Sequence, residues 1–541
     1  MMDFNKKDWW KEAVIYQIYP KSFQDSDGDG VGDLPGIIRR LDYLQTLGVD
    51  ALWLCPVFAS PQADNGYDIS DYCAIDPMFG TLDDMRALIR EGKKRGIGTL
   101  LDLVLNHTSD QHRWFREALK GKDNPYHDYY IWRDGTPDAL PNGMRATFGG
   151  PAWTWVPELG QYYFHQFAPQ QPDLNWANPK VRQELYAAVR FWMREGVAGF
   201  RLDVIDQVGK DPDLQVTANG PRLMEFLREL NRETFGGANL VTVGEAWGAD
   251  IPRARQYSAP DGSIFSMVFQ FEQMVLDQGP SKWEPRPMAL PDLKKSIARW
   301  QNGLHGCGWN SLFWNNHDLP RIVSRWGDDG AYRVQSAKAL AVALHGLQGT
   351  PYIYQGEELG MTNAAFPLED LRDIESLNAY KDLRAQGKTD AEAMAAIHRV
   401  GRDNARTPMQ WTAGPNAGFT TGTPWMRVNP NHTAVNAEAA LADPDSVFHT
   451  YQKLIALRKA YPVFVEGDFT LLCPDDEQVF AYVRRGGGQV MLVAVNLSGR
   501  PAAFPLPEEF AAATPLLATA GAPVPGTLRP WEALLYCQPA D

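Results

Sequence analysis

The sequence contains few cysteines and no recognisable export signal at its start. Its five cysteines are widely spaced and form no Cys-x-x-Cys pair, which argues against a zinc or dithiol redox site. Scattered cysteines in an odd number are typical of a protein from a reducing compartment. The first twenty residues are charged and lack the apolar core of a signal peptide. We therefore expect a cytoplasmic protein.

Long apolar runs and an excess of positive charge are also missing. No segment reaches the ~18 consecutive apolar residues of a membrane-spanning helix. The net charge is -14, whereas nucleic acids and anionic membranes require a basic surface. We expect no nucleic-acid or membrane partner. The 541 residues exceed the size of one hydrophobic core, which predicts two or three domains. We expect the chain to act as a monomer.

Eight short apolar segments alternate with longer helical patterns such as Val181–Glu195 and Pro221–Phe235. This alternation predicts βα units around a parallel sheet, and eight strands close a TIM (β/α)8 barrel. The expected strands are Val14–Tyr19, Ala51–Cys55, Gly98–Leu105, Ala198–Val204, Asn239–Glu245, Ser266–Phe271, Ser311–Trp314 and Pro351–Tyr354.

Two parts of the chain depart from the βα pattern. Residues 108–176, between the third and fourth expected strands, are rich in Trp, Tyr, Pro and Gly. A structureless loop of that length is rare, so we expect a small inserted domain there. Residues 1–107 and 177–466 would form the barrel. In residues 467–541, short apolar segments such as Val479–Arg484 and Gln489–Asn496 predict a C-terminal antiparallel, β-sandwich-like domain.

Two carboxylates end successive strands, where the reactive groups of a TIM barrel lie. Arg201 and Asp203 are two residues apart, so both side chains face one side of a strand. Arg201 would keep Asp203 ionised by lowering its pKa, as a nucleophile requires. Glu245 follows an apolar run, which would raise its pKa, as a general acid requires. Retaining glycosidases place two such carboxyl groups about 5 Å apart. Each residue taken singly is more often structural than catalytic, and only their combination favours catalysis.

Other polar residues follow the remaining strands. His107 ends the third strand, His317 and Asp318 end the seventh, and Asp68 follows the second in NGYDISDY. The spacing around the two histidines is not that of a zinc site. Hydrogen bonding to sugar hydroxyl groups is therefore our interpretation.

Residues 25–33, DSDGDGVGD, alternate oxygen donors as an EF-hand loop does. Position 12 of the pattern is Gly36 instead of glutamate, so the loop is not a complete EF-hand. The many oxygens favour Ca²⁺ over Mg²⁺. The expected ligands are Asp25, Asp27, Asp29 and Asp33 through their side chains and Val31 through its carbonyl.

Four segments, DLVLNH, GFRLDV, VGEAWG and NNHDLPR, resemble the four ordered regions of the α-amylase family, glycoside hydrolase family 13. QPDLNW resembles a further region of its oligo-1,6-glucosidase subfamily. The resemblance extends to GIIRRLDYLQTLGVDALWLCPVF, GTPYIYQGEELGMTN and RDNARTPMQW, and so covers nearly the whole chain. It implies a structural Ca²⁺ in the loop 25–33.

The resemblance also implies residue roles. Asp203 matches the nucleophile, Glu245 the acid/base and Asp318 the transition-state stabiliser. The pair of Asp68 and Arg402 would close the back of the pocket and admit only a chain end. The residues expected to hold the terminal glucose are Tyr67, Asp68, His107, Gln171, Arg201, His317 and Arg402.

Three further positions bear on the linkage. Val204 after the nucleophile resembles α-1,6-specific enzymes, whereas maltose-cleaving relatives tend to carry Ala or Thr. Trp247 and the segment Ser266–Gln273 resemble the dextran glucosidase branch, where a tryptophan stacks on the second sugar. Glu375 matches a residue that contacts that sugar. We expect a retaining exo-acting α-glucosidase of isomalto-oligosaccharides that also transfers glucose to sugar hydroxyl groups.

Other functions on the same fold remain open. The site could serve an α-1,4-glucosidase, or a sucrose or trehalose isomerase, although RIVSRWGDDGAYR lacks the arginine-rich loop of sucrose isomerases. A non-catalytic protein like the transporter heavy chains is the alternative from another class. Those proteins have a membrane anchor and a degraded site, whereas this chain keeps all three carboxylates.

Overall fold

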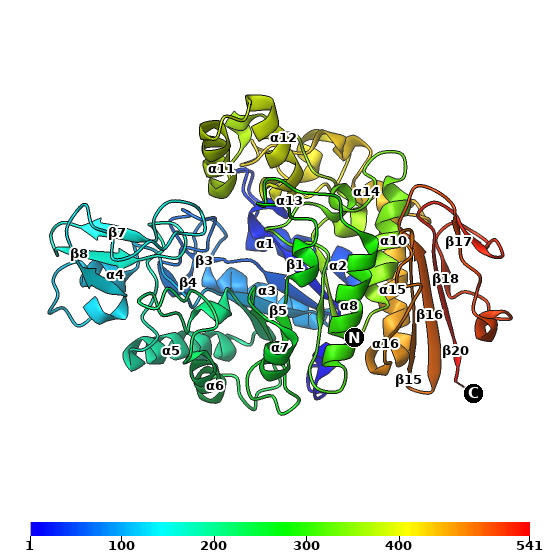
Figure 1. Ribbon diagram of the computed structural model, residues 1–541, viewed down its shortest axis with the longest axis horizontal. Helices are drawn as coiled ribbons and strands as arrows, with labels where there is room; N and C mark the ends of the chain where they lie inside the picture. The colour runs from blue at the N-terminus through cyan, green and yellow to red at the C-terminus, as the bar shows by residue number, and fades with distance from the viewer. Residues whose placement is uncertain (1, 541) are drawn as a thin grey trace.

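A computed structural model describes residues 2–540 (Figure 1). Its centre is a barrel of eight parallel strands in the order β11-β10-β9-β5-β2-β1-β13-β12. All eight expected strands are confirmed; the first seven are shorter than expected, and the eighth begins one residue earlier. They are β1 (Ile15–Ile18), β2 (Ala51–Leu54), β5 (Gly98–Leu103), β9 (Gly199–Leu202), β10 (Val241–Glu245), β11 (Met267–Phe269), β12 (Ser311–Leu312) and β13 (Thr350–Tyr354).

The barrel is closed between β11 and β12 by one isolated parallel bridge. Val268 pairs with Asn310 there, and the Ser311 hydroxyl donates to the Val268 carbonyl over 2.8 Å. Every other neighbouring pair of barrel strands shares at least two registered residue pairs. The strands are buried on both faces, which explains why they read as continuous apolar runs.

Helices cover the outside of the barrel and begin at recognisable caps. In α3, Thr81 and Asp84 form a capping box, and Asn178 caps α5 before Pro179. The expected helices Val181–Glu195 and Pro221–Phe235 correspond to α5 and α6. The helices of this layer are α1 (Leu34–Arg39), α2 (Leu41–Leu47), α3 (Leu82–Lys94), α5 (Pro179–Glu195), α6 (Leu223–Glu233), α7 (Ile251–Tyr257), α8 (Leu290–Leu304), α9 (Ile322–Arg325), α10 (Arg333–His345), α14 (Ala437–Ala442), α15 (Val447–Ala460) and α16 (Val463–Glu466). Within residues 2–540, none of the helices is both long and apolar enough to cross a bilayer.

The segment between β5 and α5 contains a small antiparallel sheet at one end of the molecule (cyan in Figure 1). Its strand order is β6 (Trp132–Asp134), β8 (Gln161–Phe164) and β7 (Trp153–Val156), and α4 (Arg113–Ala118) precedes it. The Leu174 amide donates to the Asn106 carbonyl, which ties the end of this segment to the end of β5. A second extension, β3 (Phe58–Ala59) with β4 (Asp71–Ile75), follows β2.

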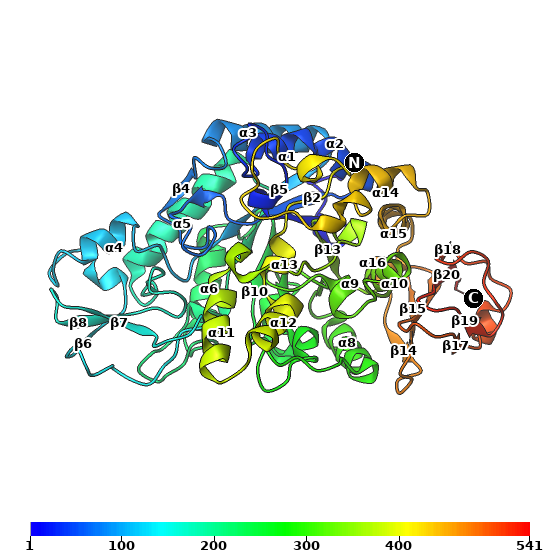
Figure 2. The ribbon, with the colours of Figure 1, turned by 90° about the horizontal axis from the view of Figure 1, so that it is seen from above.

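The C-terminal residues form an antiparallel sheet at the opposite end (Figures 1 and 2). Tyr482 and Arg484 bond to backbone carbonyls at the end of α10, so the sheet packs on the barrel. The main sheet has the order β14 (Thr470–Leu472), β15 (Val479–Gly486), β16 (Gln489–Asn496), β20 (Ala533–Pro539) and β18 (Leu517–Ala518), and β17 (Ala502–Ala503) pairs with β19 (Thr527–Leu528).

A helical excursion after β13 completes the top of the barrel. It consists of α11 (Ile374–Ala385), α12 (Asp390–Val400) and α13 (Asp403–Arg406), drawn in yellow-green and yellow in Figure 1. Glu375 lies in the first turn of α11, and Arg402 directly precedes α13. The excursion thereby brings two expected site residues to the strand ends.

Candidate active site

A cavity of about 440 Å³ opens at the carboxyl ends of the barrel strands. Most of the site residues expected from the sequence line it, and Arg201 and His317 contact the lining from beneath. The expected residues in its wall are Tyr67, His107, Gln171, Asp203, Val204, Glu245, Trp247, Asp318, Glu375 and Arg402.

Arg201 on β9 joins three carboxylates. Its Nη1 donates to Asp203 Oδ1 over 2.7 Å and to Asp102 Oδ1 over 2.8 Å, and its Nη2 donates to Glu245. The expectation that Arg201 serves Asp203 alone, with Glu245 in apolar surroundings, is therefore wrong. Asp102, on neighbouring β5, was missed because its distance along the chain hides its closeness across the barrel.

Burial has the largest effect on the pKa of Asp203 in this cluster. It raises the pKa of Asp203 well above its usual range, and the nearby Glu245 and Asp102 add to the rise although Arg201 opposes it. The sequence had predicted a lowered pKa for Asp203. One guanidinium faces three buried carboxylates, so their titrations are coupled, and any proton bound there belongs to the group as a whole.

Asp318 forms the opposite side of the site and stays ionised. Its Oδ2 lies 3.1 Å from His317 Nε2, and its Oδ1 accepts from Arg402 and Arg406 over 3.2 and 2.9 Å. Burial alone would raise the pKa of Asp318, but these cations hold it well below the usual range. Burial alone would lower the pKa of His317, and the Asp318 carboxylate instead raises it to about 10.

Asp64, and not Asp68, is the partner of Arg402. Arg402 Nη2 lies 3.4 Å from Asp64 Oδ1 and 2.6 Å from Asp373 Oδ1. Asp68 is fully buried, and its oxygens accept from the Ala63 and Asp64 amides over 2.9 and 3.0 Å. The predicted pair of Asp68 with Arg402 is therefore wrong, because Asp68 holds the loop that presents Asp64.

Amide, imidazole and aromatic groups complete the inner wall. Gln171 Nε2 donates to Asp64 Oδ2 over 3.1 Å and lies 3.2 Å from His107 Nε2. Burial lowers the pKa of His107 to about 4, so its imidazole is neutral. Phe148 and Phe167, which the sequence reading missed, come from the inserted segment. The Arg402 guanidinium stacks over Phe148 at 4.9 Å.

The mouth of the cavity carries an exposed tryptophan. Trp247 is 44% exposed and stacks in parallel on Phe271, with ring centroids 3.8 Å apart. Its indole N–H donates to Glu245 Oε1 over 2.9 Å. Nearby, Lys282 Nζ pairs with Glu375 Oε2 over 2.6 Å. The ring and this ion pair line the same cavity as Asp203 and Glu245, and Glu375 Oε2 also lies 3.4 Å from Arg402 Nε.

Val204 has a strained backbone. Its φ of 35° is in the left-handed region, which is unfavourable for a β-branched residue. This conformation directs the Val204 amide to Glu245 Oε2 at 3.0 Å. The strain thus serves to place one donor on a carboxylate that the site uses.

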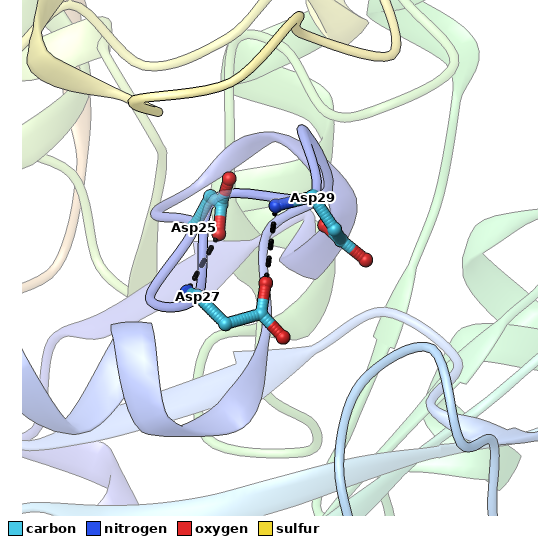
Figure 3. A group of neighbouring side chains, drawn as sticks. All are labelled: Asp25, Asp27 and Asp29. Carbon is cyan, nitrogen blue, oxygen red and sulfur yellow. Dashed lines mark hydrogen bonds between the residues drawn. The ribbon is translucent and has the colours of Figure 1, made fainter.

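The acidic loop lies before α1, apart from this cavity. The carboxylates of Asp25, Asp27 and Asp29 come within 4.8 Å of one another, and backbone amides of the loop bind Asp25 and Asp27 (Figure 3). Asp33 closes the loop by accepting from the Ser26 amide over 2.8 Å. A side chain at Gly30 would meet the Thr423 carbonyl at 1.8 Å, so the loop packs tightly on the 420–425 segment.

Comparison with known proteins places the chain in a family. The model of the alpha amylase catalytic domain matches residues 17–467. The chain belongs to the alpha-amylase family. The C-terminal domain of maltogenic amylase matches residues 469–530. Retention of configuration is general for this family, and the chain is a retaining glycoside hydrolase.

Close relatives within the alpha-amylase family differ in substrate. The chain is 51% identical to an oligo-1,6-glucosidase of Parageobacillus thermoglucosidasius, over 98% of both chains. It is 53% identical to a trehalose-6-phosphate hydrolase of Escherichia coli, over 91% of both chains. The solved structure of the Bacillus licheniformis trehalose-6-phosphate hydrolase superimposes with a TM-score of 0.93 at 46% identity, over 98% of this chain and all of that one.

Proposed function

We propose that this enzyme removes single glucose units from the non-reducing end of isomalto-oligosaccharides by cleaving α-1,6 bonds. The observation that carries the proposal is the closed inner end of the cavity. There Arg402 joins Asp64, Asp318 and Asp373, and these ion pairs would block the path of a continuing sugar chain. A terminal glucose fits such a pocket, whereas the middle of a polysaccharide does not.

The proposed mechanism is double displacement. Asp203 attacks the anomeric carbon and forms a β-glucosyl ester, while the protonated Glu245 gives its proton to the leaving oxygen. Glu245 then takes a proton from water, which attacks the ester and releases α-glucose. Arg201 holds both carboxylates, and ionised Asp318 stabilises the positive charge of the oxocarbenium-like transition state. A sugar hydroxyl that replaces water would give transglucosylation.

The proposed α-1,6 preference rests on the outer part of the cavity. Val204, Trp247 and the Lys282–Glu375 pair line the cavity, and we assign the second sugar to the space beside them. Trp247 offers a flat apolar face, and Glu375 and Lys282 offer hydrogen bonds to sugar hydroxyl groups. The resemblance of Val204 and Trp247 to α-1,6-specific enzymes supports this assignment over cleavage of α-1,4 bonds.

A phosphorylated disaccharide is the second candidate, because trehalose-6-phosphate hydrolases are close relatives. The charges of the cavity argue against it. Among its described lining residues only Lys282 and Arg402 are cationic, and both are paired with carboxylates. A phosphate would therefore meet no free cation and would face Glu375.

A substrate panel tests the proposal. Initial rates should be measured on isomaltose, isomaltotriose, maltose, sucrose, trehalose and trehalose 6-phosphate at equal concentration. We expect the highest kcat/KM for isomaltose or isomaltotriose. A higher value for maltose or for trehalose 6-phosphate would refute the linkage or the substrate assignment.

We also propose that the loop 25–33 binds a structural Ca²⁺ through Asp25, Asp27, Asp29 and Asp33 and the Val31 carbonyl. A bound cation would relieve the repulsion between these carboxylates. A chelator should then lower the thermal midpoint of the enzyme, added Ca²⁺ should restore it, and Asp27→Asn should abolish the response. An equal chelator effect on both proteins would contradict the assignment.

We further propose a monomeric cytoplasmic enzyme. All five cysteines are free, which fits a reducing compartment. Light scattering during gel filtration tests the oligomeric state, and a mass of two chains or more would contradict it.

A further inference from the structure

Trp247 belongs to a turn that a neighbouring loop holds from beneath. The turn follows Glu245 on β10, and the loop follows Asp203 on β9. The two meet at Gly248. Its amide donates to Asp206 Oδ2 over 3.0 Å, and its carbonyl accepts from Asn219 Nδ2 over 2.9 Å. Both polar groups of Gly248 are thus bound by side chains of the loop.

This clamp, defined as Asp206 and Asn219, is itself anchored. The Asn219 amide donates to the Asp206 carbonyl over 2.8 Å, and the Tyr257 hydroxyl donates to Asn219 Oδ1 over 3.1 Å. Asn219 has a φ of 57°, in the left-handed region that asparagine tolerates. A Cβ on Gly248 would lie 2.4 Å from Asn219 Nδ2, so a larger residue there would displace the Asn219 side chain from its bond.

Asp206 is costly to bury. The residue is fully buried, and its Oδ1 has no hydrogen-bond partner in residues 2–540. Burial raises its pKa to about 7, and Glu245 on β10 adds to the rise, whereas the amide of Gly248 and Arg253 on α7 oppose it. A buried carboxyl group with an unbound oxygen lowers stability. The Asp206 carboxyl group nevertheless lies next to the turn of Trp247, and holding that turn would explain why this position carries an aspartate.

We propose that Asp206 and Asn219 are positioning residues that hold Trp247 against the second sugar of the substrate. This inference rests on the proposed function, which gives Trp247 that contact. Trp247 adjoins the clamped Gly248, donates to Glu245 and stacks on Phe271. A turn released at Gly248 would lose the fixed orientation of the indole ring, while Asp203 and Arg201 on β9 would stay in place.

The test compares a disaccharide with an aryl glucoside. The second glucose of isomaltose must bind beside Trp247. In contrast, 4-nitrophenyl α-glucoside has no second sugar, and its nitrophenolate is a good leaving group. Asp206→Ala and Asn219→Gly each remove one clamp bond, and glycine keeps the positive φ. We expect each to raise KM for isomaltose about tenfold, which is the effect of losing about one hydrogen bond. KM for the aryl glucoside should change less than about twofold on the same basis.

Two further variants separate positioning from a general loss of structure. Asp206→Asn keeps an oxygen acceptor for the Gly248 amide and should remain close to the parent enzyme. Glu357→Gln changes another buried carboxyl group outside the cavity and should leave both KM values unchanged. In a Trp247→Ala background, the clamp substitutions should have no further effect on isomaltose.

The outcomes distinguish the two proposals. Unchanged KM for isomaltose in both clamp variants, equal losses on both substrates, or full additivity with Trp247→Ala would each overturn the inference. If the parent enzyme did not hydrolyse isomaltose, this result would overturn the proposed function instead. The same variants would then be compared on the disaccharide that the parent cleaves, with the same criteria.

Discussion

Glu357→Gln should change how stability depends on pH. Glu357 lies three residues after the end of β13 in a buried turn, where its Oε1 accepts from the Tyr451 hydroxyl over 2.7 Å. Its Oε2 has no partner among the described residues. Burial raises the pKa of Glu357 from 4.5 to about 8, and the adjacent Glu358 adds to the rise. The folded protein therefore keeps this carboxyl group protonated at neutral pH.

The sign and size of the effect follow from proton linkage. Between pH 4.5 and 8 the folded chain binds a proton that the unfolded chain has lost, so the free energy of unfolding falls as pH rises. Each pH unit is worth about 1.4 kcal/mol. From pH 5.5 to 7.5 the parent should lose about 3 kcal/mol through this group alone. Glutamine has the shape of the protonated acid and no proton to lose, so the variant should escape that loss.

Urea unfolding at several pH values measures the difference. We expect Glu357→Gln to match the parent near pH 5.5 and to exceed it increasingly toward pH 7.5. Glu358→Gln provides the contrast, because Glu358 accepts from Tyr16, Tyr43 and the Gly356 amide. One amide oxygen cannot replace those acceptors, so the free energy of unfolding of Glu358→Gln should be below that of the parent already at pH 5.5. A constant difference between Glu357→Gln and the parent would show that Glu357 is ionised in the folded state, contrary to our reasoning.

Four other substitutions test the site. Asp203→Asn should lower kcat on 4-nitrophenyl α-glucoside by more than about 10³-fold with an unchanged circular dichroism spectrum, and near-normal activity would exclude Asp203 as nucleophile. Val204→Ala should raise the ratio of maltose to isomaltose kcat/KM about tenfold, since one or two methyl groups in a pocket are worth this much; an unchanged ratio would remove Val204 from the linkage argument. Asp64→Asn should raise KM for the aryl glucoside at least about tenfold, because Arg402 loses a partner, whereas Asp68→Asn should mainly lower the thermal midpoint. The reverse pattern would restore Asp68 as the pocket residue.

The barrel was predictable because its signal is local. Each strand is a short apolar run, and the polar residue that ends it marks the edge where the site lies. Asp203, Glu245 and Asp318 could be singled out for that reason. The inserted segment could be expected only as a departure from the pattern, and the two phenylalanines it adds to the cavity had no signal of their own.

The errors arose where residues meet across the barrel or within a loop. Asp64 and Asp68 are four residues apart in one loop, and no periodicity tells which of them turns toward Arg402. Arg201 and Asp102 are on neighbouring strands but about a hundred residues apart in the sequence. The charge of Asp203 depends on all the groups around it, so a pair read from spacing predicted the wrong direction for its pKa.

The single bridge between β11 and β12 gives the barrel a seam. Local opening begins where the fewest backbone hydrogen bonds must break, so the amides of these two strands should exchange with deuterium before those of β2 or β5. Phe271, on which Trp247 stacks, lies two residues beyond the end of β11. Local opening of the barrel and widening of the cavity mouth therefore both involve β11. A ligand that packs against Trp247 should slow amide exchange in β11 and β12.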